Sequence, residues 1–270
     1  MTDSIIKIQN LTHIYPRGEV RALDNINLNI KSGDVVSIIG QNGSGKTTLV
    51  RHFNGLLRPT EGKIFIDSED MENVSSYEMS KKCGYVFQNP NHQIFNETVR
   101  KELLVGPKNY KMSKEETKDS LEYVVELLNI ENILDKHPMT LDYTTKKILT
   151  IASILIYRPE IVVLDEPTGG LDEIGRRSLS NVINILNKEG RTVIIISHDM
   201  DYVAENSKSI VVMAKAKVLA EGKPKDIFAK EDILKQAQVE PPQITILENR
   251  LFKNKELSLS VDDFVNKYKY

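Results

Sequence analysis

The sequence predicts an α/β fold built around a largely parallel, buried β-sheet. Short runs rich in valine and isoleucine alternate with segments of helical periodicity, which is typical of parallel strands joined by covering helices. The clearest strand candidates are residues 35–39, 161–164 and 193–196. Residues 64–66 and 210–213 indicate two further strands, which we expect at the edges of a sheet.

The middle of the chain is predicted to be helical. Ser113 and Glu116 form a capping box, in which each side chain bonds the backbone of the other residue at a helix start. A second helix is expected over residues 144–157, and no strand pattern interrupts residues 100–157. The first helix repeats apolar residues on one face, at Leu121, Val124, Val125 and Leu128. We therefore expect a helical insertion between two strands, at about residues 89–160.

The end of the chain differs from the rest in composition. The sequence turns polar after Gly222, and Pro241 and Pro242 mark the start of a small extension. We therefore divide the chain into a main domain, residues 1–235, and a C-terminal extension, residues 236–270.

The overall composition of the 270 residues excludes several classes of protein. With 40% hydrophobic and 27% charged residues, the chain can fill a sizeable core. A formal net charge of −2 gives no electrostatic basis for general nucleic-acid binding. The one cysteine, Cys83, cannot pair within the chain, so the fold does not depend on an oxidising compartment. No run approaches the ~18 apolar residues of a membrane span, so we expect a protein that is not embedded in a membrane.

A phosphate-binding pattern follows the first buried strand. The residues Gly40-Gln41-Asn42-Gly43-Ser44-Gly45-Lys46-Thr47 fit G-x-x-x-x-G-K-[ST]. Glycines let successive backbone N–H groups point into one concavity, and the positive end of the following helix favours the same anion. We expect Lys46 to reach the β- and γ-phosphates of ATP and the Thr47 hydroxyl to bind Mg²⁺, with Thr48 also in the nucleotide site. Residues 47–57 are predicted to form the helix, with one apolar face made by Leu49, Phe53 and Leu56.

Polar residues that suit ATP hydrolysis follow three other apolar runs. Asp165 and Glu166 end a buried strand, where side chains project into the ligand crevice of an open α/β sheet. Asp165 is suited to hold Mg²⁺ and Glu166 to take the proton of an attacking water, as a general base. His198 follows the strand at 193–196, at the same sheet edge, and is a further catalytic candidate. The amide of Gln88 is able to bridge Mg²⁺ and the attacking water.

Together these residues resemble the nucleotide-binding subunits of ATP-binding cassette (ABC) transporters. The resemblance covers residues 1 to about 230 and implies a P-loop ATPase core with an added antiparallel β subdomain. It implies that Tyr15 stacks on adenine, that His198 contacts the γ-phosphate and that Asp172 lies in a loop crossing to a partner subunit. Such cassettes work as dimers that sandwich two ATP molecules head to tail. The matching order is Tyr15, the phosphate loop, Gln88, a signature region, Asp165-Glu166, Gly170-Leu171-Asp172 and His198.

Finer features are similar to energy-coupling factor transporters, which take up vitamins and metal ions. Residues 86–95 resemble a segment that faces the membrane coupling protein in that subfamily, with Asn91, Gln93 and Phe95 as the expected contacts. Gly106-Pro107 and residues 240–245 also resemble the subfamily, and the alternative for these segments is an ordinary loop and a disordered tail.

The resemblance to this subfamily also implies partners and a location. They are a second cassette subunit, a membrane coupling protein and a substrate-specific membrane subunit, with no nucleic acid, at the cytoplasmic face of the cell membrane. In the family, solute specificity lies in the separate membrane subunit.

One segment departs from the family pattern. Where the family has Leu-Ser-Gly-Gly-Gln, this chain has Leu141-Asp142-Tyr143-Thr144-Thr145, here called the signature segment. In the family this loop touches the γ-phosphate bound to the opposite subunit. A carboxylate at Asp142 would oppose that phosphate at a cost of several kcal/mol, more than the helix end contributes. We therefore expect a heterodimer, in which a second cassette supplies an intact signature to the ATP on this chain.

The sequence is consistent with two hypotheses about the function. The first is an ATPase that drives transport, and the second is a nucleotide-binding regulatory or structural subunit with little hydrolysis of its own. Glu166 and His198 favour the first, because a subunit that only binds has no use for a base. A cassette protein acting on ribosomes or DNA is disfavoured by the acidic balance, and a small-molecule kinase by the lack of an acceptor lid.

Overall fold

The apolar runs predicted as strands lie at the centre of the molecule. In the computed structural model, which describes residues 4–16, 20–252 and 257–269, they are β3 (Val35–Ile39), β7 (Ile161–Asp165) and β8 (Thr192–Ile196). All three strands are buried along their whole length. The three predictions are confirmed, since continuous runs of branched apolar residues suit a strand covered on both faces.

These strands belong to a six-stranded sheet with the order β10-β9-β3-β8-β7-β6. Its other members are β6 (Cys83–Val86), β9 (Ser209–Ala214) and β10 (Lys217–Gly222). All neighbouring strands are parallel except β9 and β10, which form an antiparallel hairpin. The carboxyl ends of β3, β7 and β8 therefore meet at one edge, which is where such sheets bind ligands.

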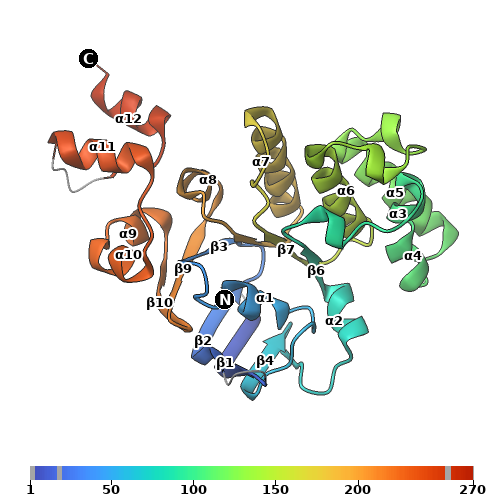
Figure 1. The fold of residues 1–270 in the computed structure, drawn as a ribbon, viewed down its shortest axis with the longest axis horizontal. Coiled ribbons are helices and arrows are strands. Elements are labelled where there is room, and N and C mark those ends of the chain that lie inside the picture. Colours follow the sequence, from blue (N-terminus) through green and yellow to red (C-terminus); the bar gives the residue numbers. More distant parts are fainter. Residues whose placement is uncertain (1–3, 17–19, 253–256, 270) are drawn as a thin grey trace.

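A second sheet is antiparallel, as the family resemblance implies, with the order β2-β1-β4-β5. Its strands are β1 (Ser4–Tyr15), β2 (Val20–Lys31), β4 (Glu61–Ile66) and β5 (Glu69–Asp70). Helix α1 (Lys46–Arg51) lies between the two sheets in Figure 1. Leu49 and Val50 of α1 are fully buried in one core that takes side chains from both sheets.

The expected edge positions of residues 64–66 and 210–213 are wrong. The first run lies in β4, between β1 and β5, and the second in β9, between β10 and β3. In each case a two-residue turn with left-handed backbone adds an outer strand, and such turns join hairpins whose strands twist normally. The turns contain no glycine, which is why the sequence did not reveal them; their φ values are 50° at Asp67, 64° at Ser68, 47° at Lys215 and 65° at Ala216.

The helix after the phosphate loop is shorter than predicted. It ends at Arg51 rather than at residue 57, and Leu56, expected on its apolar face, is 51% exposed. The ring Nδ1 of His52 bonds the Thr48 carbonyl at 2.7 Å, while the His52 backbone N–H turns to the Leu49 carbonyl. A side chain that takes the carbonyl needed for the next helical bond ends the helix at that point.

The segment between β6 and β7 contains helices and no strand among its described residues. Its long helices are α5 (Lys114–Leu128) and α6 (Tyr143–Leu155), and both agree with the predicted insertion. The capping box at the start of α5 is confirmed, because Ser113 accepts from the Glu116 N–H and the Glu116 side chain accepts from the Ser113 N–H. The shorter elements are α2 (Ser76–Lys82) before β6, and then η1 (Pro90–His92), α3 (Val99–Leu103), α4 (Val105–Asn109), η2 (Glu131–Ile133) and η3 (Pro138–Thr140).

Three helices cover the face of the six-stranded sheet opposite α1 (Figure 1): α6, α7 (Glu173–Lys188) and α8 (Met200–Asn206). Alternate side chains of each strand enter different cores, because successive residues of a strand point to opposite faces. Val163 faces α1, whereas Val162 and Leu164 pack with α6 and α7. The sheet thus fixes α6 relative to the ends of β7 and β8.

Four helices follow β10: α9 (Pro224–Phe228), α10 (Glu231–Ala237), α11 (Gln243–Phe252) and α12 (Val261–Tyr268). The alternative of a disordered tail is wrong for the described part of this region, since α11 and α12 form a helical pair at one end of the molecule (Figure 1). The buried carboxylate of Glu248 joins them by accepting from Lys267 Nζ at 2.9 Å and Tyr268 Oη at 3.0 Å. Residues 1–3, 17–19, 253–256 and 270 of the two predicted domains lie outside the described residues.

No helix within the described ranges is both long and apolar enough to cross a membrane.

Candidate nucleotide-binding and hydrolysis site

A cavity of about 550 Å³ lies where β3, β7 and β8 end. It brings together residues from both sheets, α1 and α6, which are up to 183 positions apart in sequence, from Tyr15 to His198. Its predicted lining residues are Tyr15, Asn42, Gly43, Ser44, Gly45, Lys46, Thr47, Thr48, Gln88, Tyr143, Asp165, Glu166 and His198. The sequence therefore identified most of the wall of this cavity.

The phosphate loop has a backbone that glycine alone adopts without strain. Gly40 has φ 145° and Gly45 has φ 106°. A Cβ at Gly40 would lie 2.0 Å from the Met213 carbonyl oxygen, and one at Gly45 would lie 2.5 Å from that of Ala22. Side chains are therefore excluded at both positions, and the loop is free to curl against β9 and β2.

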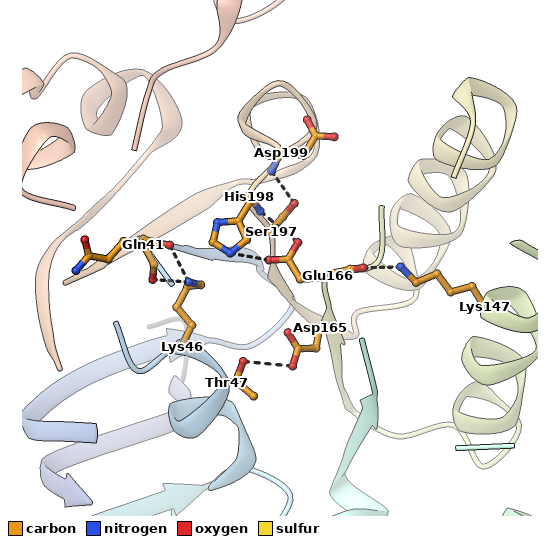
Figure 2. A network of polar contacts seen from close by, with 10 residues as sticks. Gln41, Lys46, Thr47, Lys147, Asp165, Glu166, Ser197, His198 and Asp199 are labelled. Carbon is orange, nitrogen blue, oxygen red and sulfur yellow. Dashed lines mark hydrogen bonds and ion pairs between the residues drawn. The ribbon is translucent and has the colours of Figure 1, made fainter. Parts of the chain in front are cut away.

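The loop is built for an anion. The hydroxyl of Ser44 is buried and has no hydrogen-bond partner among the described residues, so it is available to a bound group. Lys46 is buried and donates to the carbonyl oxygens of Gly40 at 2.7 Å and Gln41 at 3.0 Å (Figure 2). Burial lowers the pKa of Lys46, and among the described residues its ammonium group has no ion-pair partner within 4 Å. These features fit the phosphates of ATP.

Two of the predicted nucleotide residues contribute only through their backbone. Gly40 and Gln41 are not in the cavity wall, and each accepts from Lys46 with its carbonyl oxygen. The Gln41 N–H donates to Ala237 of α10 at 3.0 Å, and its side chain points away from the other labelled residues (Figure 2). The predicted role of Gln41 is thus confined to shaping the loop.

Two oxygen ligands suited to Mg²⁺ are adjacent. The hydroxyl of Thr47 donates to Oδ2 of Asp165 at 3.4 Å, which joins the start of α1 to the end of β7. The hydroxyl of Tyr85 donates to the same carboxylate oxygen at 2.5 Å. Hydroxyl and carboxylate oxygens are ligands that Mg²⁺ prefers, and such sites take their remaining ligands from phosphates and water. The donor set therefore fits this ion.

Glu166 has an unusual backbone. Its φ is 49°, the left-handed region, which costs a non-glycine residue roughly 1–2 kcal/mol. Its N–H donates to the Ile196 carbonyl of β8 at 2.9 Å, so strand pairing continues one residue past β7. This conformation turns the side chain toward the cavity, and such strain is found where the surrounding structure holds a functional group.

The carboxylate of Glu166 faces His198. Its Oε2 accepts from the His198 backbone N–H at 3.3 Å, and its Oε1 lies 3.2 Å from the ring Nε2 (Figure 2). Burial raises the pKa of Glu166 to about 7, and burial also lowers the pKa of His198. A carboxyl group with a pKa near neutrality is suited to take and release a proton.

Tyr15 and Gln88 both line the cavity. The Tyr15 hydroxyl is 3.2 Å from Oγ1 of Thr48, so the predicted adenine contact and the phosphate-loop helix are linked. His13 packs edge-to-face against the Tyr15 ring, with 4.7 Å between ring centroids. Gln88 lines the cavity, and its carbonyl oxygen accepts from the Tyr143 hydroxyl at 3.5 Å.

The signature segment lies at the start of α6. The carboxylate of Asp142 caps this helix by accepting from the Thr145 N–H at 2.9 Å and the Thr145 hydroxyl at 2.6 Å. The Tyr143 ring packs on Gly170, and the Thr144 hydroxyl donates to the Gly170 carbonyl at 3.5 Å. Within the single chain, Tyr143 and Thr144 therefore contact the chain's own loop after Glu166, while Asp142 bonds its own helix. The two remaining predicted interface residues are Leu141, which packs on the core, and Asp172, which caps α7.

The three predicted coupling residues lie outside the cavity and differ from one another. Asn91 is exposed and Phe95 is 74% exposed. Gln93 is instead bonded within the chain: its Oε1 accepts from the Phe87 N–H at 3.1 Å, and its Nε2 donates to the Thr150 carbonyl at 3.2 Å. The side chain of Gln93 thus fastens this segment to α6.

Two residues of the site were missed from the sequence. Lys147 lines the cavity from α6, and Tyr85 reaches Asp165 from β6. The available signal for Lys147 was a lysine one turn before the apolar Ile151 in a helix whose buried positions are mostly apolar. Tyr85 gave no such signal, because a tyrosine in a buried strand is ordinary core.

The fold and the site define a P-loop ATPase cassette, and the comparisons place it in a family. The ABC transporter family matches residues 23–169, so the chain belongs to that family, and the match indicates an ATPase. An energy-coupling factor transporter ATP-binding protein, EcfA2, of Clostridium tetani is 40% identical over 267 residues, covering 96% of this chain and 92% of that protein. The chain also spans about half the length (46%) of a 38% identical relative, a putative ABC transporter ATP-binding protein of Caldanaerobacter subterraneus.

Solved structures agree with this membership. The structure of cbiO1 from Clostridium perfringens, part of the ABC transporter complex cbiONQ, has a TM-score of 0.78 and 32% identity, covering 93% of this chain and 96% of that chain. The dimeric ATP-binding cassette MJ0796 bound to ADP and Pi has a TM-score of 0.73 and 31% identity, covering 81% and 98% of the two chains. The predicted resemblance to ATP-binding cassettes of the energy-coupling factor type is confirmed.

Proposed function

We propose that this chain is the ATP-hydrolysing subunit of an uptake transporter of the energy-coupling factor type, for a vitamin or a transition-metal ion. The observation that carries the proposal is the position of Glu166. Its carboxylate is held against His198 at the edge of the sheet where the phosphate loop and Asp165 also lie (Figure 2). A subunit that only bound ATP would need the loop but not this carboxylate.

Each residue of the site has a role in the proposed reaction. The loop N–H groups, the Ser44 hydroxyl and Lys46 bind the phosphates, and Tyr15 stacks on the adenine. Thr47, Gln88 and Asp165 would hold Mg²⁺, which neutralises phosphate charge when bound. Glu166 orients and deprotonates the attacking water, while His198 fixes the Glu166 carboxylate and contacts the γ-phosphate.

The proposed assembly is a heterodimer with a second cassette. The relative MJ0796 is a dimer, which supports a paired cassette here. Hydrogen bonds from Thr145 lower the pKa of Asp142, so this carboxylate stays ionised at the start of α6. The Asp142 carboxylate accepts from the Thr145 backbone N–H, a donor that the phosphate of the partner's ATP would need. The same carboxylate repels that phosphate. An intact signature in another cassette would therefore serve the ATP on this chain, while the partner's ATP turns over slowly.

The proposed location is the cytoplasmic face of the cell membrane, through membrane partners. The cbiO1 relative is part of a transporter complex, which supports a membrane coupling protein and a substrate-specific membrane subunit. Asn91 and Phe95 present exposed side chains for the coupling contact, and Gln93 holds their segment on α6. ATP-driven dimer closure would then be transmitted through this segment.

Replacement of the base tests the function. We expect Glu166→Gln to lower kcat for ATP hydrolysis by about 10²–10⁴-fold while the Kd for ATP stays close to that of the wild type. The matched control is Glu122→Gln on α5, an exposed glutamate that pairs with Lys118 at 3.8 Å and lies outside the cavity. Wild-type turnover by Glu166→Gln in the assembled complex would reject the proposal.

That rejecting outcome would favour the second candidate, a nucleotide-binding subunit with little hydrolysis. This candidate is supported by the position of Asp142, whose carboxylate caps α6 where the family has a serine. In a homodimer of this chain, both signature segments would carry this change. ATPase rates of the chain alone and of the chain mixed with a second cassette separate the cases. Robust hydrolysis by the pure chain would contradict the heterodimer.

A further inference from the structure

The contact between Lys147 and the backbone of Glu166 joins two parts of the site that the proposed function treats separately. Lys147 is the fifth residue of α6 and is 2% exposed. Its Nζ donates to the Glu166 carbonyl at 2.6 Å and to the Gly169 carbonyl at 2.8 Å. Figure 2 shows it reaching Glu166 from the opposite side to His198. The lysine therefore spans the turn that follows the candidate base.

The backbone of Glu166 needs such support. With φ at 49°, this residue is held on its N–H side by the Ile196 carbonyl at 2.9 Å. On its carbonyl side the backbone partner is the Gly169 N–H at 3.4 Å, a long bond. The Lys147 bond at 2.6 Å is the short contact on that side. A change in the peptide after Glu166 would rotate the carboxylate away from His198, because side-chain direction follows φ and ψ.

Stability alone does not account for an ammonium group here. Both acceptors of Lys147 are neutral carbonyls, and burial lowers the pKa of Lys147 to about 8. Lys147 has no directly paired counter-ion among the described residues, and removing a charge from water without one is unfavourable. An apolar side chain of similar length would avoid that penalty at the cost of the two hydrogen bonds to the carbonyls. One turn further along the same helix face Ile151 is buried, so a methionine would suit these surroundings.

We infer that Lys147 is a positioning residue for ATP hydrolysis: it holds the left-handed backbone of Glu166, and it ties the base to the helix that begins with the signature segment. The inference rests on the proposed function, since it assigns a task only if Glu166 is the base. Its geometric consequence is that movement at the start of α6, where a partner subunit would engage, reaches the backbone of the base directly through Lys147, while Tyr143 and Thr144 contact the same loop farther along, at Gly170.

The closing experiment compares kcat and KM for ATP in the complex of this chain with a second cassette and its membrane partners. We expect Lys147→Met to lower kcat by about 10- to 100-fold, with KM changed by less than about twofold, because misplacement of the base affects the transition state and not ATP binding. Lys147→Arg, which can donate to both carbonyls, should restore most of the rate. Lys188→Met, at the exposed end of α7, removes the same charge outside the cavity and should leave kcat unchanged.

The outcomes separate this inference from the proposed function. Wild-type kcat in Lys147→Met, together with loss of turnover in Glu166→Gln, would overturn the inference and leave the function standing. Wild-type turnover in Glu166→Gln would overturn both. If Lys147→Met does not fold, judged by its Tm, Lys147→Gln and Lys147→Arg carry the test: equal kcat values for these folded variants and the wild type would overturn the inference, and an order of Arg above Gln supports it.

Discussion

The hydroxyl of Tyr85 donates a 2.5 Å hydrogen bond to Oδ2 of Asp165, and this bond joins β6 to the carboxyl end of β7 inside the site. The same carboxylate oxygen accepts from Thr47 at 3.4 Å. Burial raises the pKa of Tyr85, so its hydroxyl keeps its proton and acts as a donor. Tyr85 thus orients the carboxylate of Asp165, the proposed Mg²⁺ ligand.

The first prediction concerns this orienting bond. We expect Tyr85→Phe to raise the Mg²⁺ concentration needed for half-maximal ATPase activity by about 10- to 100-fold, as is usual when the hydrogen-bond partner of a metal ligand is removed. The measurement is a Mg²⁺ titration of ATP hydrolysis. Tyr77→Phe is the control, because the Tyr77 hydroxyl donates to the Asn109 carbonyl on the surface. An unchanged Mg²⁺ dependence would show that Tyr85 is only core.

The second prediction concerns the signature segment. Replacing Asp142→Ser, Tyr143→Gly and Thr144→Gly together should raise turnover of the ATP bound to the partner cassette by about 10-fold or more, equivalent to at least about 1.4 kcal/mol of relieved repulsion. Serine at position 142 still caps α6, so the N-terminal hydrogen bond of this helix is kept.

The partner's turnover is isolated by placing these three changes in a Glu166→Gln background. This chain's own base is then inactive, so any rise in phosphate release comes from the partner's ATP. No rise in that background would contradict the account of Asp142 as the cause of the asymmetry.

The third prediction concerns a buried histidine pair behind Tyr15. His52 is fully buried; its Nδ1 bonds the Thr48 carbonyl at 2.7 Å, and its Nε2 lies 3.2 Å from Nδ1 of His13. Nδ1 of His13 also bonds the Arg58 carbonyl at 3.0 Å. Burial lowers the pKa of His52 to about 4 from 6.5. The ring is therefore neutral in the folded protein at neutral pH.

The sign of the pH effect follows from this shift. Between pH 6.5 and 4 the unfolded chain binds a proton at His52 and the folded chain does not. The contribution of His52 to the free energy of unfolding is therefore fully present above pH 6.5 and is lost as the pH falls. From pH 7 to pH 5 we expect the free energy of unfolding to fall by about 2 kcal/mol through His52. Denaturant titrations of the wild type and His52→Gln measure it. The variant should be less stable at pH 7 and less sensitive to acid, and equal acid sensitivity of both proteins would contradict the assignment.

Much of the fold could be predicted because its signals are local. The three buried strands are continuous apolar runs, and the capping box at Ser113 and Glu116 is complete within four residues. The β1, β2, β6 and β10 strands were not identified from their residues. In β1 and β10 buried and exposed positions do not alternate regularly. In β2 they alternate over residues 26–31, a signal that was available in the sequence. At the early end of α1 the His52 ring, and not its backbone N–H, bonds the Thr48 carbonyl, a contact that no composition rule anticipates.

By itself the sequence determined which chemistry this chain can perform. The phosphate loop, Asp165, Glu166 and His198 stand in fixed relation to the strands that precede them, and parallel strands bring their carboxyl ends to one edge wherever they occur. Only the tertiary structure decided how the side chains of the site are oriented. Tyr85 reaches Asp165 across neighbouring strands, Lys147 reaches Glu166 from α6, and Asp142 turns its charge onto its own helix. These contacts join residues through packing and rotamer choice, which short sequence patterns do not encode.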